Sequence, residues 1–177
     1  MFVKLTTSFA AVLIVFVSGL TLYAQEATGP RPKRARTAED YQPGTLKELA
    51  AKAANQENRQ NETMVIDPDL SPTRVRATYA GSTARTPAAK EKLIAEWARR
   101  YAGAPETYTN TYEVDVAFTE NGNDYWLTFK KKTLTPFWNS DKWNKPVDLF
   151  VIKMGAIKQG DKWVPVLLVE SFQEAPK

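Results

Sequence analysis

The 177-residue sequence contains no cysteine and no histidine. Without cysteine, the chain has no disulfide, no thiol nucleophile and no cysteine-linked lipid anchor. Without histidine, it lacks the usual general base of serine and cysteine hydrolases and the commonest transition-metal ligand. These two absences argue against a zinc enzyme that supplies its own ligands. We therefore expect no bound metal and no other cofactor.

A focused positive charge is also missing. The chain carries 24 Lys and Arg against 20 Asp and Glu, a net charge of +4. From Leu70 to the end there are 16 basic and 12 acidic residues, so this part is only mildly positive. Nucleic-acid-binding domains usually show a stronger and more concentrated basic field. We therefore do not expect nucleic acid as a partner.

The N-terminus has the pattern of an export signal. Lys4 precedes an apolar run from Phe9 to Leu20, and the small Ala24 suits the position before a cleavage site. We predict a signal peptide over residues 1–24 and a periplasmic or secreted bacterial protein. The alternative is an uncleaved membrane anchor, because the run from Leu5 to Ala24 is long enough to span a bilayer. Only this alternative makes a membrane a partner of the chain.

Residues 25–69 are rich in Pro, Gly, Thr and charge and lack apolar periodicity, which predicts a flexible linker. Within this linker, Thr45 and Glu48 have the spacing of a capping box. Apolar residues that follow them share one helical face. We therefore predict a short helix near residues 45–54.

Residues 70–174 have the patterns of a folded α+β domain. Alternation around Val75–Tyr79 predicts a strand, and Thr86-Pro87 begins a helix whose apolar residues recur at helical spacing up to Tyr101. Tyr112, Val114, Val116 and Phe118 alternate with polar residues, which predicts a strand with one buried face.

The rest of this domain is predicted as two hairpins joined by a loop. Asn121-Gly122 favours a tight turn into a partner strand at 125–131. Residues 133–145 are interpreted as a long loop, and residues 147–156 and 163–172 as strands joined by a turn at Gly160. The order predicts a small curved antiparallel sheet, or a partly open OB-like or SH3-like barrel, of about five strands with one packed helix.

The C-terminal strands carry a resemblance. The runs Asp124–Leu127, Val147–Ala156 and Trp163–Phe172 resemble small secreted bacterial proteins of unassigned function that have a C-terminal β-rich domain. The resemblance covers about the last 55 residues. It implies a bacterial envelope protein and no particular activity.

Two groups of residues are candidates for a site. Aromatic faces beside cations suit stacking on sugars or packing against a partner, which makes a set of five the ligand-binding candidates: Trp126, Lys130, Phe137, Trp138 and Trp143. The alternative is that these rings fold inward and plug the sheet. Glu113 and Asp115 lie two apart on a strand, roughly 7 Å from one another, as in paired glycosidase carboxylates. Their alternative is a solvated polar face.

The sequence is compatible with three functions. The first is an exported, non-catalytic binding or interaction module of the bacterial envelope, whose partner would be an envelope protein or polymer. The second is a carboxylate-dependent hydrolase that acts on an envelope polymer. The third is an OB-like nucleic-acid binder, which requires that the N-terminus is not an export signal.

Overall fold

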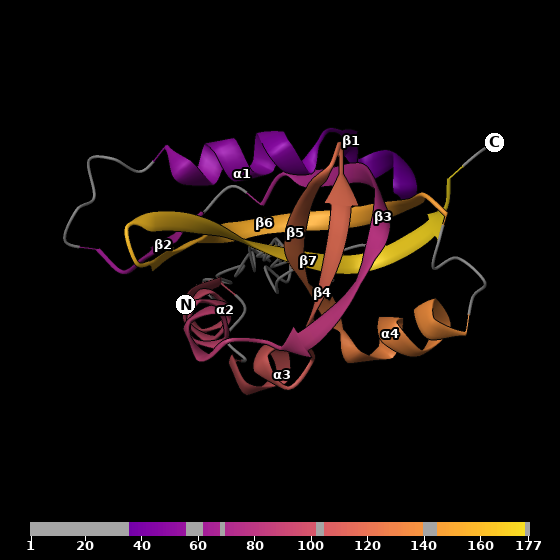
Figure 1. Cartoon of the computed structure of the whole chain (residues 1–177). Coiled ribbons are helices and arrows are strands. Elements are labelled where there is room, and N and C mark those ends of the chain that lie inside the picture. The colour runs from indigo at the N-terminus through magenta and orange to yellow at the C-terminus, as the bar shows by residue number, and fades with distance from the viewer. Residues whose placement is uncertain (1–35, 56–61, 68–69, 102–104, 140–144, 176–177) are drawn as a thin grey trace, which may run out of the picture. The chain divides into compact units, whose positions relative to one another are not determined.

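A computed structural model describes residues 36–55, 62–67, 70–101, 105–139 and 145–175. The predicted signal peptide and Trp143 lie outside these residues. The described chain is an α+β fold built on one mixed sheet of seven strands, with helices packed against it (Figure 1). The predicted α+β class is confirmed. The sheet has seven strands rather than about five, and more than one helix packs on it.

The elements follow in chain order. The strands are β1 (Gln42–Pro43), β2 (Met64–Ile66), β3 (Pro72–Arg85), β4 (Tyr112–Glu120), β5 (Asn123–Lys130), β6 (Val147–Gln159) and β7 (Lys162–Glu174). The helices are the 3-10 turn η1 (Ala38–Asp40), α1 (Leu46–Ala54), α2 (Ala88–Tyr101), α3 (Pro105–Thr109) and α4 (Lys131–Trp138).

Five of the strands form a closed circuit of pairings that begins and ends at β3. The first part of β3 pairs with β6 from Pro72 to Ala77, and its second part pairs with β4 from Thr78 to Arg85. The two predicted hairpins, β4–β5 and β6–β7, are present, and β5 pairs with β7. The pairings therefore run β3–β4–β5–β7–β6 and back to β3.

The prediction of a purely antiparallel sheet is wrong at two places. β1 is parallel to β3, and β5 is parallel to β7. Both pairs join strands that are not neighbours in the chain, and local turn signals say nothing about such pairs.

Two buried clusters lie on the two sides of β6 and β7. The larger receives apolar side chains from all five strands of the circuit and from helices α1 and α4. The smaller lies under α2, where Leu93, Ile94 and Trp97 meet Ile152 and Met154 of β6. Burial on both faces explains why the sequence of β6 is apolar on both sides.

A register shift in β4 separates Tyr112 from Val114 and Val116, which the sequence places on one face with it. Tyr112 belongs to the cluster under α2, whereas Val116 belongs to the larger cluster and Val114 packs against it. The pairing with β5 shifts between Tyr112 and Val114, so Glu113 lies in a β-bulge. The extra residue of a bulge breaks the two-residue alternation.

Helix α1 forms where the capping box predicts it. The Thr45 hydroxyl accepts from the Glu48 amide at 3.1 Å, and the Glu48 carboxylate accepts from the Thr45 amide at 3.0 Å. The buried Glu120 of β4 also accepts from the amides of Leu46 and Lys47 at 2.9 and 3.0 Å. A carboxylate at this end of a helix satisfies unpaired amides and complements the helix dipole. The described residues from Arg36 onward belong to one compact unit, which therefore starts before the predicted boundary at residue 70.

The prediction of a loop from residue 133 is wrong, because residues 131–138 form helix α4. Pro136 lies inside α4, where it removes one backbone donor. Leu134 and Phe137 are nevertheless spaced to face the same side, and both are buried in the larger cluster. This burial outweighs the unfavourable local propensity.

Candidate ligand-binding pocket

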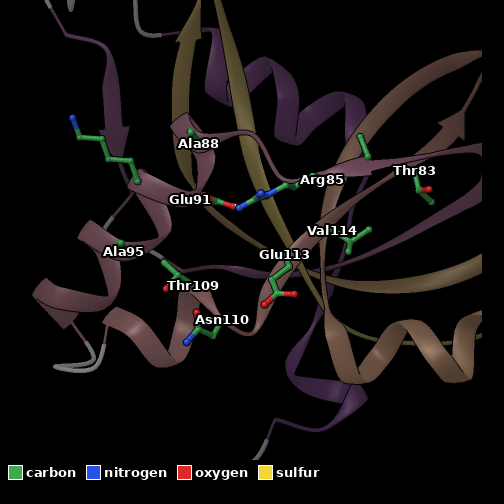
Figure 2. Close-up of a pocket in the computed structure, with 11 residues that line it drawn as sticks. Thr83, Arg85, Ala88, Glu91, Ala95, Thr109, Asn110, Glu113 and Val114 are labelled. Carbon is green, nitrogen blue, oxygen red and sulfur yellow. The ribbon is translucent and has the colours of Figure 1, made fainter.

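An open pocket of about 960 Å³ lies where β3 ends and β4 begins (Figure 2). One wall is the exposed face of α2, and another comes from the end of α3 and the turn that follows it. The lining residues are Thr83, Ala84, Arg85, Ala88, Glu91, Lys92, Ala95, Thr109, Asn110, Glu113 and Val114.

The sequence of α2 explains why there is space beside it. Ala88, Glu91, Lys92 and Ala95 recur at helical spacing, so they share the face opposite to the buried one. Two of these four side chains are single methyl groups, which leave room against the strands. The bulge at Glu113 supplies the opposite wall.

The charges of the pocket are paired only loosely. Arg85 lies 3.8 Å from Glu91 and its side chain is 87% exposed, and Lys131 lies 3.4 Å from Glu113. Figure 2 shows Arg85 and Glu91 pointing toward one another, with Glu113 and Asn110 on the other side of the pocket. Exposed pairs of this kind contribute at most about 1 kcal/mol each. They can therefore exchange their partners for the charged groups of a ligand.

A buried polar network lies close to the pocket in sequence. Lys90, at the start of α2, donates to Asp115 Oδ2 at 2.5 Å and to the backbone oxygen of Trp126 at 3.2 Å. The hydroxyls of Thr86 and Thr128 donate to Asp115 Oδ1 at 3.2 and 2.7 Å. The side chains of Lys90 and Asp115 are 2% and 3% exposed. This network was not predicted from the sequence, because Lys90 lies next to Glu91 and Lys92 and its spacing does not mark it as buried.

The structure separates the two carboxylates that the sequence offered as a glycosidase pair. Glu113 lines the pocket, whereas Asp115 is buried against Lys90. A glycosidase needs both carboxyl groups beside one substrate bond. The candidate pair is therefore not formed, and the alternative of a solvated face holds for Glu113 but not for the buried Asp115.

The four ligand-binding candidates that the structure describes do not meet in one place. Trp126 is 40% exposed on β5, and Phe137 is 2% exposed in the core. Trp138 is half-buried, with its ring 5.4 Å from that of Tyr79 and 5.1 Å from that of Phe137. Lys130 contacts Glu170, and Trp143 lies outside the described residues. None of the four described residues lines the pocket.

A second polar cluster surrounds Glu170 of β7. Tyr41 donates to Glu170 Oε2 at 2.5 Å, Arg36 donates to the same oxygen at 3.0 Å, and Lys130 donates to Oε1 at 3.3 Å. Burial by itself would raise the pKa of Glu170. The hydrogen bond from Tyr41 and the charges of Lys130 and Arg36 outweigh it, so the pKa lies below its ordinary value. Burial first, and then the contact with Glu170, raise the pKa of Tyr41.

This cluster joins the start of the described chain to the sheet. Arg36 and Tyr41 belong to the segment before β1, and the Tyr41 ring packs edge-on against Phe150 at 4.9 Å between ring centres. Every polar contact named here is internal to the protein. The cluster therefore has a clear structural role.

The described residues contain no group of three or more carboxylates that could hold a metal ion. Within the same residues, no helix combines the length and the apolar character needed to cross a membrane. No protein-family model and no curated protein matches the sequence.

Proposed function

We propose that the chain is an exported, non-catalytic binding module of the bacterial cell envelope, and that its pocket holds a short peptide segment carrying both positive and negative groups. The observation that carries the proposal is the pocket itself, with loosely paired charges of both signs on its walls. The predicted export signal and the resemblance to small secreted bacterial proteins support the location.

The composition of the pocket supports a binding role. Polar groups on its walls come from Arg85, Lys92, Glu91, Glu113 and Asn110, and each can meet a backbone or side-chain group of a peptide. Its carboxylates lie beside cations, and the nearby buried acid Asp115 is held by Lys90. General acid–base catalysis needs a carboxyl group within hydrogen-bond reach of the reacting group; in this proposal the pocket carboxylates instead form exposed ion pairs that a peptide can replace.

The scaffold in this proposal is a small, partly open barrel. The strand circuit β3–β4–β5–β7–β6 and its shared apolar cluster support an OB-like or SH3-like arrangement. The pocket lies at the ends of two strands of this circuit, with α2 beside it. Ligand sites commonly lie at the mouth of a barrel.

The test is a titration of the isotope-labelled protein with a pentapeptide that contains one Lys and one Glu. We expect amide resonances of Ala88, Ala95 and Asn110 to shift. An Arg85→Ala, Lys92→Ala double variant should bind about tenfold more weakly, because two exposed charge contacts are worth about 0.5–1 kcal/mol each. The matched control is Lys47→Ala, Lys162→Ala, which removes two exposed lysines outside the pocket.

Cell-wall sacculi and exported proteins both present such peptides, and a second arm distinguishes them. Co-sedimentation with purified sacculi that is lost in the pocket variant identifies the wall as the source, whereas binding of the soluble peptide alone identifies a protein. Unchanged affinity in the pocket variant, or shifts confined to residues away from the pocket, would contradict the proposal.

A further inference from the structure

The geometry points to a covalent cross-link: we propose that Lys90 and Asp115 form an intramolecular amide bond that ties helix α2 to strand β4. This inference is independent of the ligand proposed above. It rests on the buried network that joins Lys90, Asp115, Thr86 and Thr128, none of which lines the pocket.

The two side chains that would react are in contact and shielded from water. Lys90 Nζ lies 2.5 Å from Asp115 Oδ2, and both side chains are almost completely buried. The carbon of the carboxyl group is one bond beyond this oxygen, so the nitrogen is close to the separation of about 3–3.5 Å from which attack occurs. The contact from Nζ to the Trp126 backbone oxygen, at 3.2 Å, limits the positions that the nitrogen can take.

The two threonines point at the oxygen where charge develops during such a reaction. Thr86 and Thr128 both donate to Oδ1, while Lys90 contacts Oδ2. When the amine attacks the carbon, negative charge collects on Oδ1, and two donors held in place there stabilise it as an oxyanion hole does. Oδ2 is then the oxygen that leaves.

The reaction balances within the pair and needs no co-reactant. The ammonium group of Lys90 carries three protons and the carboxylate of Asp115 carries none. One proton passes to Oδ2, the nitrogen bonds to the carbon, and a second proton passes to Oδ2. The bond from the carbon to Oδ2 breaks and one water leaves. The amide keeps the third proton on nitrogen, and no oxidation or reduction occurs.

Such a bond would serve a protein that has no cysteine. It closes a loop of chain between positions 90 and 115, as a disulfide does in other exported domains, and so restricts the unfolded chain. Its other consequence is the loss of two buried charges, whose burial is otherwise costly.

The test is peptide mapping of the purified wild-type protein after denaturation and trypsin digestion. We expect one branched peptide that joins Lys90 to Asp115, lighter by one water than its two parts together, and no cleavage after Lys90. Recovery of the two parts as separate linear peptides overturns the proposal and leaves an ordinary buried ion pair. This outcome does not depend on any variant folding.

Variants test the assigned roles. The double variant Lys90→Met, Asp115→Ala removes both partners, so no charge is left buried alone, and it should give only linear peptides. The control Lys47→Met replaces an exposed lysine and should keep the branched peptide. Thr128→Val keeps the shape and removes the 2.7 Å donor, so a pulse–chase experiment should show the bond forming about a hundredfold more slowly. Formation at the wild-type rate in a folded Thr128→Val variant would overturn the role of the hydroxyl.

Discussion

Gly155 of β6 lies where the short strand β2 pairs with it. Its φ is 149°, and a Cβ atom there would lie 2.0 Å from the backbone oxygen of Val65. Any side chain must therefore push β2 away from the sheet. At Gly160, in the β6–β7 turn, φ is 61° and a Cβ atom would meet open space. Gly155 is therefore needed because no side chain fits beside β2, whereas Gly160 is needed only for its positive φ.

We predict that Gly155→Ala lowers the free energy of unfolding by about 2–4 kcal/mol, because overpacking and backbone strain add there. The control Gly160→Ala should cost only about 1–2 kcal/mol, the cost of a left-handed residue with a side chain. Urea unfolding midpoints at unchanged slope measure both changes. Equal losses in the two variants would show that β2 does not hold its place as the structure has it.

Glu170 makes stability depend on pH at the acidic end. Its folded-state pKa lies below the ordinary value, through the hydrogen bond from Tyr41 and the charges of Lys130 and Arg36, which outweigh the opposing effect of burial. A depressed carboxyl pKa contributes stability that is complete above the unfolded pKa and is lost as pH falls through the folded one. We predict that Glu170→Gln flattens the fall in unfolding free energy below about pH 4.3.

Thermal unfolding at a series of pH values measures this effect. The matched control is Glu113→Gln, whose partner Lys131 is 73% exposed and whose pair is therefore weak. The wild-type protein and this control should lose stability in parallel as pH falls. A Glu170→Gln variant with the same acid sensitivity as the wild type would contradict the assignment.

Helix α4 places one of the aromatic candidates, Phe137, among the rings of the larger cluster. The Phe137 ring lies 5.7 Å from the rings of Phe118 and Phe129 and 5.2 Å from that of Phe172, measured between centres. These contacts place Phe137 in the core. Trp126, by contrast, is 40% exposed on β5.

We predict that Phe137→Ala lowers the free energy of unfolding by about 3–5 kcal/mol, because it opens a cavity among packed rings. Trp126→Ala, whose ring is partly in water, should cost about 1 kcal/mol. Calorimetry of the two variants gives the comparison. Similar losses would mean that α4 is not docked on the sheet.

Turns and helix starts that depend on a few neighbouring residues were predicted correctly from the sequence. Asn121 and Gly122 both have positive φ in the β4–β5 turn, as the sequence predicted, and α2 follows Thr86-Pro87. Helix α4 was missed because its stability comes from burial of Leu134 and Phe137, against the preference of Pro136. The face of Tyr112 was predicted wrongly for a similar reason, because the alternation of apolar and polar residues gives no sign of the bulge between Tyr112 and Val114.

At the scale of the whole molecule, the pocket brings together four elements that the chain visits between Thr83 and Val114. The walls of the pocket depend on the point where β3 changes its partner from β6 to β4 and on the bulge in β4. Neither feature can be predicted from the spacing of residues in the sequence. The sequence did contain one usable signal, the small and charged residues on the exposed face of α2. The aromatic residues suggested a different site, but Phe137 lies in the core and Trp126 lies outside the pocket.

The structure also extends the folded part of the chain beyond the sequence estimate. Strand β1 pairs with β3, β2 pairs with β6, and Arg36 contacts Glu170. Besides the predicted helix, residues that local composition assigned to a linker therefore supply two strands and an ion pair, because tertiary partners stabilise segments that are too short to fold alone.

The most direct test of the central claim places a photo-activated cross-linking amino acid at position 92, in the pocket, in living cells. The control places it at position 47, on the exposed face of α1. If the chain is an exported peptide-binding module, position 92 yields adducts with wall peptides or exported proteins that position 47 does not yield. Equal adducts at both positions, or adducts with cytoplasmic components, would contradict the account.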